Sequence, residues 1–296
     1  MVGGPQDIIE AEEPRGPRRW VGVAVLAVLV AVPVISLLAS REPVRTAEPS
    51  PTLVPQPTAT FARQEPNVLR PEVRRRGGEE FVDVVFPDGT RAEVGYPDKL
   101  GLAEMGVRPV QGAWLDGYIG VFRQLEAPYS GVAEVSEGRP MIRELNDRVT
   151  LWPAEGPAVG QTMLFEFGRW VMALRDNPRG MTFEQRMLWA ENLRGKVTKD
   201  GYLVLSARHP VRLAGPGQAF RGEQSGPQLW FGSVRETLIV IAPIPDCDVG
   251  KIELAVIQRR GRFSAERCQN GFYVAVAGNP LLVQPIIEGV RVKPAK

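Results

Sequence analysis

The chain contains one histidine, His209, which restricts the chemistry that its side chains can perform. A metal site with several histidine ligands is excluded, and a serine-histidine-aspartate triad would have to use this one residue. His209 directly precedes Pro210, which predicts an extended loop. No G-x-S-x-G motif is present to supply a nucleophile. We therefore interpret His209 as a surface or structural residue.

Other catalytic signatures are missing as well. The sequence has no phosphate-binding loop, no dinucleotide-binding fingerprint and no C-x-x-C pair. These absences argue against an ATPase, a dehydrogenase and a thioredoxin-like oxidoreductase. Accordingly, we predict no catalytic residue, no cofactor-binding residue and no metal ligand.

Carboxylate chemistry stays open, because glycoside hydrolysis needs only two Asp or Glu side chains roughly 5 to 10 Å apart. A sequence does not contain that distance. The candidate acids in the middle of the chain are Glu166, Asp176 and Glu184. Their spacing does not distinguish them from ordinary surface charges.

Two cysteines, Cys247 and Cys268, lie in the C-terminal part of the chain. An even number of cysteines in an exported domain is typical of one disulfide, and two free thiols are the alternative. The bond would close a loop of about 22 residues and add about 3 kcal/mol of stability. Asp246 and Asp248 flank Cys247 and could offer oxygen ligands to calcium. The EF-hand spacing is missing, so a solvated turn is the favoured interpretation.

A charge-free segment, residues 20–40, stands between Arg19 and Arg41. As a helix, it would span roughly 31 Å, close to the thickness of a bilayer's hydrocarbon core. Trp20 and Ser40 mark its ends. Trp20 is typical of a membrane interface, and Pro33 would kink a membrane helix at tolerable cost. We predict an uncleaved membrane anchor; a cleaved export signal and a buried helix are the alternatives.

The orientation follows from the arginines beside this segment. Three precede it closely and two follow it, namely Arg15, Arg18 and Arg19 against Arg41 and Arg45. The positive-inside rule then predicts a single-pass protein of the cell membrane with its N-terminus in the cytoplasm and its C-terminal domain outside. A cytoplasmic domain with free thiols is the alternative.

The composition divides the rest of the chain into three parts. Residues 1–19 are predicted to be a disordered tail, and residues 41–78 a proline-rich, disordered stem. The stem ends in Arg74, Arg75 and Arg76. These could contact acidic lipid or an anionic wall polymer, but solvated arginines at a domain edge are the simpler interpretation.

Residues 79–296 are predicted to form an α+β region of mainly antiparallel strands with a few short helices, with a domain split near 150–160 as an option. A hairpin is expected around Pro87-Asp88-Gly89. Further strands are expected at "GAWLDGYIGVF", "TMLFEF", "RWVMAL", "GYLVLSA", "ETLIVIAPI", "KIELAVIQ" and "GFYVAVAG", with a turn at 259–262.

Two helices are expected in this region. Thr182 and Gln185 form a capping box that predicts a helix start. That helix should end at Gly195 and bury Phe183, Met187, Ala190 and Leu193. Asn279 and Pro280 predict the start of a second helix, which Pro285 should shorten.

The net charge of +2 does not favour a nucleic-acid partner. We expect the lipid bilayer, through residues 20–40, and a protein or envelope polymer as partners. The leading hypothesis is a non-enzymatic, membrane-tethered extracytoplasmic module for binding or assembly. The alternative is an anchored cell-envelope glycan hydrolase that uses paired carboxylates.

Overall fold

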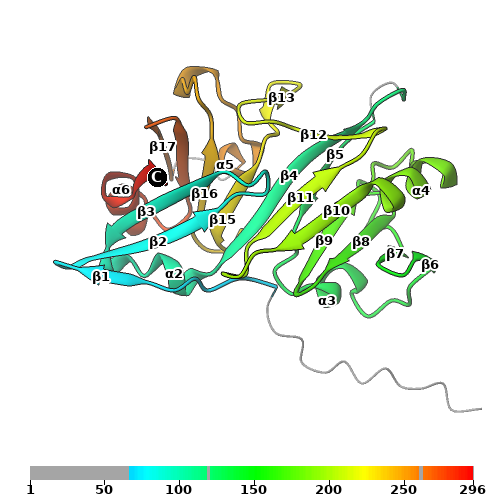
Figure 1. Ribbon diagram of the computed structural model, residues 1–296, viewed down its shortest axis with the longest axis horizontal. Helices are drawn as coiled ribbons and strands as arrows, with labels where there is room; N and C mark the ends of the chain where they lie inside the picture. The colour runs from blue at the N-terminus through cyan, green and yellow to red at the C-terminus, as the bar shows by residue number, and fades with distance from the viewer. Residues whose placement is uncertain (1–66, 119–120, 260–262, 296) are drawn as a thin grey trace, which may run out of the picture. The chain divides into compact units, whose positions relative to one another are not determined.

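The computed structural model describes residues 67–118, 121–259 and 263–295, and an 11-stranded antiparallel sheet is its central element (Figure 1). The strand order is β17-β18-β16-β15-β4-β5-β9-β8-β7-β6, and β12 pairs with β4. The strands of this large sheet are β4 (Val107–Leu115), β5 (Phe122–Glu126), β6 (Arg143–Asn146), β7 (Val149–Trp152), β8 (Thr162–Phe167), β9 (Trp170–Arg175), β12 (Val211–Leu213), β15 (Gln228–Gly232), β16 (Leu238–Pro243), β17 (Ser264–Gln269) and β18 (Phe272–Ala277).

A second layer covers one face of the large sheet. It contains the four-stranded sheet β1 (Arg74–Arg76), β2 (Glu79–Val85), β3 (Arg91–Pro97) and β19 (Arg291–Pro294), and the hairpin β10 (Leu193–Val197) with β11 (Leu203–Ala207). A small hairpin joins β13 (Ala219–Phe220) to β14 (Glu223–Gln224). The helical segments are η1 (Asp98–Leu100), α2 (Leu102–Met105), α3 (Val132–Ser136), α4 (Phe183–Asn192), η2 (Val249–Lys251), α5 (Ala255–Gln258) and α6 (Pro280–Gly289).

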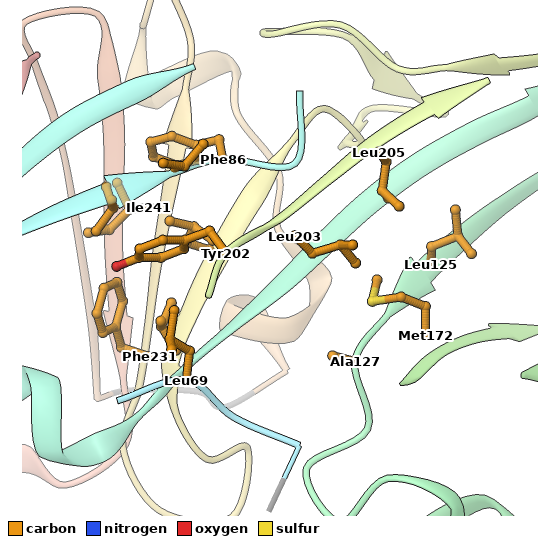
Figure 2. Packing of buried hydrophobic residues seen from close by; sticks show 14 of the residues in the cluster. Leu69, Phe86, Leu125, Ala127, Met172, Tyr202, Leu203, Leu205, Phe231 and Ile241 are labelled. Carbon is orange, nitrogen blue, oxygen red and sulfur yellow. The ribbon is translucent and has the colours of Figure 1, made fainter. Parts of the chain in front are cut away.

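The main hydrophobic core lies between these two layers. Figure 2 shows Tyr202, at the start of β11, beside Phe231 of β15 and Ile241 of β16, with Phe86 nearby. Successive strand side chains point to opposite faces of a sheet. The alternate residues of β15, β16 and β18 therefore enter a second cluster, which Leu254 and Ile257 complete at α5. A third, smaller cluster packs Val135 of α3 on β7, β8 and β9.

The prediction of a mainly antiparallel domain with few short helices is confirmed for the described residues. The hairpin around residues 86–90 forms as expected, and Gly89 has the positive φ that its turn requires (91°). The strands 162–167 and 170–175 pair with each other. Both bonds of the Thr182–Gln185 capping box are present, and Asn279 caps α6.

Other predictions at element level were wrong. "KIELAVIQ" begins at the last residue of η2, contains α5 and is not a strand. Leu254 and Ile257 pack into the core from the helical turn of α5, and β17 takes the place beside β18. Phe183 is 53% exposed and not buried, whereas Ala190 and Leu193 are buried as predicted, together with Trp189. Gly195 lies within β10, so α4 ends before it.

Pro285 lies inside α6 and does not end it; it is exposed, while Val283, Ile286 and Ile287 pack inward. "GAWLDGYIGVF" spans a turn between β4 and β5. The fold reaches further toward the N-terminus than residue 79, since Leu69 pairs with Val107 and β1 pairs with β2. The predicted turn at 259–262 falls largely outside the described residues.

Candidate functional site

A groove of about 1040 Å³ lies beside the point where the described chain begins. Its lining comes from four places: the segment 69–74, the strands β2, β3 and β19, the β8–β9 turn at Arg169, and the β10–β11 turn at 199–202. Residues that are far apart in the sequence therefore meet here because the small sheet and two turns lie side by side.

Basic side chains outnumber acidic ones in this groove. The lining has six cationic side chains and four carboxylates: Arg70, Arg74, Arg91, Arg169, Lys199 and Lys293 against Glu72, Asp83, Glu93 and Asp200. A groove with such an excess attracts anions, and its low-dielectric walls strengthen the local field.

Two of the carboxylates are already paired with one arginine. The guanidinium of Arg74 lies 2.7 Å from Asp83 and 3.1 Å from Glu93. The neighbouring Arg75 pairs with Glu80 at 2.9 Å. The basic cluster that the sequence indicated is thus exposed, as expected, but two of its three arginines are bound within the small sheet.

The remaining cations are more available. Arg91, Lys199 and Lys293 are exposed and form no ion pair with any described residue. Arg70 and Arg169 donate only to main-chain carbonyl groups, at 3.4 and 2.8 Å. We define Arg91, Lys199 and Lys293 as the free cations of the groove. Their charges can meet an anionic ligand without breaking an existing ion pair.

A second group of charges lies on the other face of the large sheet, around Arg175 of β9. Its Nε lies 3.0 Å from both carboxylate oxygens of Glu155, and its Nη1 donates to Glu126 of β5. Glu134 of α3 lies 3.7 Å from Nη2. One guanidinium thus ties together two strands, a loop and a helix. We call these four residues the Arg175 cluster.

Burial shapes the electrostatics of this cluster. Loss of solvent raises the pKa of Glu155 and lowers the pKa of Arg175, and the nearby charge of Arg108 lowers the latter further. Arg108 is itself only 5% exposed, and burial lowers its pKa too. It donates to the carbonyl of Ala127 at 2.8 Å and lies beside the ring of Trp230.

The Arg175 cluster brings two carboxylates to one guanidinium, which is where the sequence-based hypothesis of paired acids can be examined. Glu126 and Glu155 meet at one guanidinium, and Glu155 has the raised pKa expected of a general acid. However, both carboxylates are already bound by Arg175. The arrangement thus resembles a structural ion-pair network more closely than an open catalytic pair.

The acids considered from the sequence do not meet in one site. Asp176 is 1% exposed and accepts bonds from Arg123 Nε at 2.9 Å and from the main chain of Met181, with Arg186 3.6 Å away. It therefore holds the loop before α4. Glu166 is exposed on β8. Strand alternation places its side chain on the face of the sheet opposite to Met163 and Phe165, which enter the main core. Glu184, on α4, accepts a bond from Tyr118 at 3.4 Å.

His209 is an exposed residue between β11 and β12, as expected. Asp248 serves as the cap of η2: it accepts a bond from the Gly250 amide at 3.1 Å and pairs with Lys251 at 2.9 Å. The Lys251 hydrogen bond lowers the pKa of Asp248. Within the described ranges, no group of three or more His, Cys, Asp or Glu residues could hold a metal ion.

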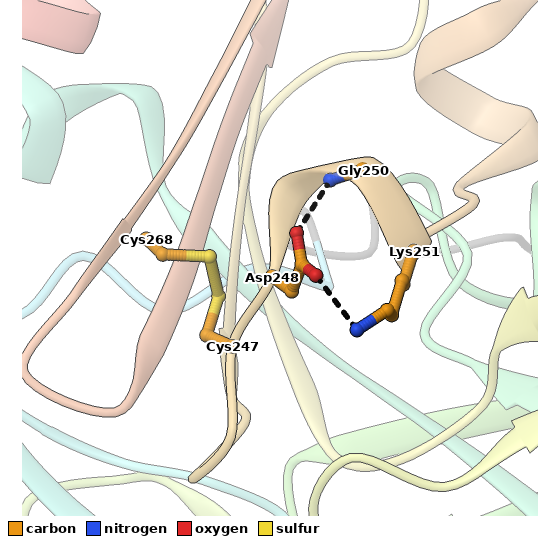
Figure 3. Close-up of a disulfide and its surroundings, with 5 residues drawn as sticks. All are labelled: Cys247, Asp248, Gly250, Lys251 and Cys268. Atoms are coloured by element: carbon orange, nitrogen blue, oxygen red, sulfur yellow. Dashed lines mark hydrogen bonds and ion pairs between the residues drawn. A yellow bond between two sulfur atoms is a disulfide. The ribbon is translucent and has the colours of Figure 1, made fainter.

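The predicted disulfide is present, with an S–S distance of 2.01 Å between Cys247 and Cys268 (Figure 3). Cys268 lies on β17 and Cys247 in the segment after β16, so the bond ties that segment to an edge strand of the large sheet. Both cysteines pack against the cluster around α5. The bond thus fastens the layer that covers this end of the sheet.

The predicted anchor residues Trp20, Pro33 and Ser40, with the tail 1–19 and the stem as far as residue 66, fall outside the described residues. None of the helices that the structure describes is long and apolar enough to cross a membrane. The anchor therefore stays a prediction from the sequence.

The groove and the Arg175 cluster were both missed in the sequence. The groove's lining comes from turns and strand ends scattered between residues 69 and 295, and no local pattern links them. Arg175 gives a weak signal, as a charge that directly ends the apolar strand 170–174. Its partners become visible only through strand pairing.

The chain was also compared with known proteins. No family model, no curated protein and no solved structure matches it.

Proposed function

We propose that this protein is a membrane-tethered extracytoplasmic binding module whose groove takes an anionic component of the cell envelope. The observation that carries the proposal is the groove's three free cations, Arg91, Lys199 and Lys293, which lie exposed around a volume of about 1040 Å³. The bilayer is the first partner, through residues 20–40. A polymer with phosphate or carboxylate groups is the second.

Electrostatic reasoning supports an anionic polymer in particular. The lining charges come from both layers of the fold, so a long ligand can meet several of them at once. Each exposed contact is weak alone, about 0.5 kcal/mol. Several together steer association and set specificity, and salt should weaken them.

The proposal can be tested on the full chain in detergent micelles with two probes, polyphosphate and polyglutamate. The test variant replaces Arg91, Lys199 and Lys293 by glutamine. The matched control replaces Arg179, Lys196 and Arg208, which are equally exposed, form no ion pair with any described residue, and lie outside the groove lining.

We expect the wild-type chain to bind at least one probe, more weakly as salt rises. The test variant should lose about tenfold in affinity, since three exposed contacts sum to about 1.4 kcal/mol. The control variant should keep its affinity. Equal losses in the two variants, or no binding to either probe, would refute the groove as the ligand site.

A second candidate function is glycan hydrolysis, which the raised pKa of Glu155 beside Glu126 favours. In this mechanism Glu155 would protonate the glycosidic oxygen, and Glu126 would act as nucleophile or base. The test is release of reducing ends from purified cell-wall glycan. E155Q and E126Q should each abolish it, whereas E166Q, on the exposed side of β8, should not. Absence of release by the wild-type chain would eliminate this candidate.

A further inference from the structure

Three exposed apolar side chains gather at one end of the large sheet. Val234 lies in the β15–β16 turn, Phe263 directly before β17, and Leu281 in the first turn of α6. They are 47, 52 and 80% exposed. These are among the largest exposures of apolar side chains in the described part of the chain, and all three residues lie within about four positions of a strand end.

Hydrogen bonds hold these three turns together. The amide of Gly278 donates to the carbonyl of Phe263 at 3.1 Å, and the amide of Asn279 donates to Thr237 Oγ1 at 3.4 Å. Gly278 also lies so close to the main chain of Glu236 that an added Cβ would be 2.2 Å from its carbonyl oxygen. The three segments therefore lie together at one end of the sheet, and we call Val234, Phe263 and Leu281 the apolar tip.

Two arginines lie close to the apolar tip in the sequence, and one acidic residue, Glu236, lies in the same turn as Val234. Arg235 follows Val234, and Arg259 ends the helix α5 before the segment that leads to Phe263. Both are exposed and form no ion pair with any described residue. Apolar side chains beside basic ones are the composition that binds the interface of an anionic membrane: the former enter between the headgroups and the latter attract them.

The chain enters the domain at this same end. Leu69 pairs with Val107 at the start of β4, and Val107 pairs with Phe231 near the end of β15, just before the turn of Val234. Leu69 is thus about two strand spacings, roughly 10 Å, from the base of that turn. Between Ser40 and Asn67 lie 26 residues, which span less than about 95 Å even when fully extended.

We propose that the apolar tip docks the domain on the bilayer surface, with Val234, Phe263 and Leu281 in the lipid interface and Arg235 and Arg259 at anionic headgroups. This inference rests on the proposed anchor at residues 20–40. Three side chains are far too few for a stable protein interface, which needs about 800 Å² from each partner. They suffice for a tethered domain, because the tether keeps the effective concentration of the lipid surface high.

The test uses the full chain in liposomes of neutral lipid with about one third phosphatidylglycerol. A spin label is placed at position 281 in L281C, and at position 142 in the control I142C. Ile142 is also an exposed apolar residue (44%), but it lies next to β6 at the far edge of the sheet. Because Cys247 and Cys268 are bonded, only the new thiol takes the label.

Two readouts separate this inference from the proposed anchor. Flotation after carbonate washing reports the anchor. The depth of each position is measured from the collision rates of the spin label with two reagents. Oxygen concentrates in lipid, whereas a nickel chelate stays in water. We expect the ratio of oxygen to nickel collisions to be several-fold higher at position 281 than at position 142. R235Q with R259Q should reduce that excess, whereas R179Q with R208Q should not.

The three possible outcomes distinguish the docking of the tip from the anchor. Retention of the chain with equal ratios at the two positions would overturn the docking of the tip and leave the anchor standing. Loss of the chain from the liposomes would overturn the anchor and this inference with it. Retention with a high ratio at 281 alone would support both.

Discussion

Two regions of this molecule use arginine in opposite ways. In the groove, Arg91 is exposed and has no carboxylate partner among the described residues. In the large sheet, Arg123 is buried against Asp176 on one face, and Arg175 pairs with the three carboxylates of its cluster on the other. The same residue type serves as a free charge in one region and as a cross-link in the other.

The difference teaches which charges are available to a ligand. A buried guanidinium needs its carboxylate, because an uncompensated charge in the interior is costly. The charge of that guanidinium is therefore balanced by its partner and is not available to a ligand. An exposed, unpaired guanidinium contributes little to stability and loses nothing by binding an anion. The groove, rather than the buried networks, is accordingly the place to seek a ligand.

The largest effect that tests this comparison is expected for Asp176→Asn. The substitution keeps the shape of the side chain but leaves Arg123, whose side chain is 7% exposed, without its counter-charge. We expect a loss of about 3 to 5 kcal/mol in the free energy of unfolding, measured by guanidinium chloride denaturation. Asp147→Asn, at an 81% exposed side chain, is the control and should change little. A loss of less than about 1 kcal/mol at position 176 would show that the buried arginine does not depend on its carboxylate, contrary to the contrast drawn between the two regions.

A smaller loss is expected for Arg175→Met. The methionine fills similar volume, but Glu126, Glu134 and Glu155 then face one another without a cation. The side chain of Arg175 is 22% exposed, so solvent partly screens the repulsion among the carboxylates. We expect a loss of about 2 kcal/mol in the free energy of unfolding. In an E155Q background the loss should shrink, as a double-mutant cycle would show. Arg208→Met, at an exposed position, is the control.

The pH dependence of stability gives a third test. Burial raises the pKa of Glu155 in the folded state above its ordinary value of 4.5. Between that value and the raised one, the folded state holds a proton that the unfolded state has lost. The contribution of Glu155 to stability therefore falls as the pH rises through this window. E155Q removes the contribution.

The measurement is the difference in unfolding free energy between E155Q and the wild type, from pH 4 upward. As the pH rises, we expect the wild type to lose stability relative to E155Q. E166Q serves as the control. A difference that stays constant with pH, or moves in favour of the wild type, would show that Arg175 governs Glu155 more strongly than burial does.

The smallest effect is expected in the groove. Replacing Arg91, Lys199 and Lys293 by glutamine should change the free energy of unfolding by less than about 0.5 kcal/mol, because these charges hold no other described residue in place. The same denaturation experiment checks it. A loss as large as that of Arg175→Met would mean that the free cations are structural, and the contrast between the two regions would disappear.

Local patterns allowed several elements to be predicted correctly. The capping box of Thr182 and Gln185, the Asn279 cap and the hairpin at Gly89 depend on contacts within a few residues, so the sequence contains all that they need. The disulfide needed only two cysteines and an expected compartment. The strand at "KIELAVIQ" and the burial of Phe183 were wrong, because competition for places beside a sheet is decided by distant residues.

The sequence by itself therefore determined the mainly antiparallel fold class, the caps and the disulfide, because periodicity, turn residues and an even cysteine count are short-range signals. It also predicts the anchor at residues 20–40, from length and hydropathy alone. Only the tertiary structure decided which charges are paired. Arg175 meets Glu126 across a strand pair 49 residues apart, and the groove's cations converge from both layers of the fold. Such meetings depend on strand order and register, which a single sequence does not specify.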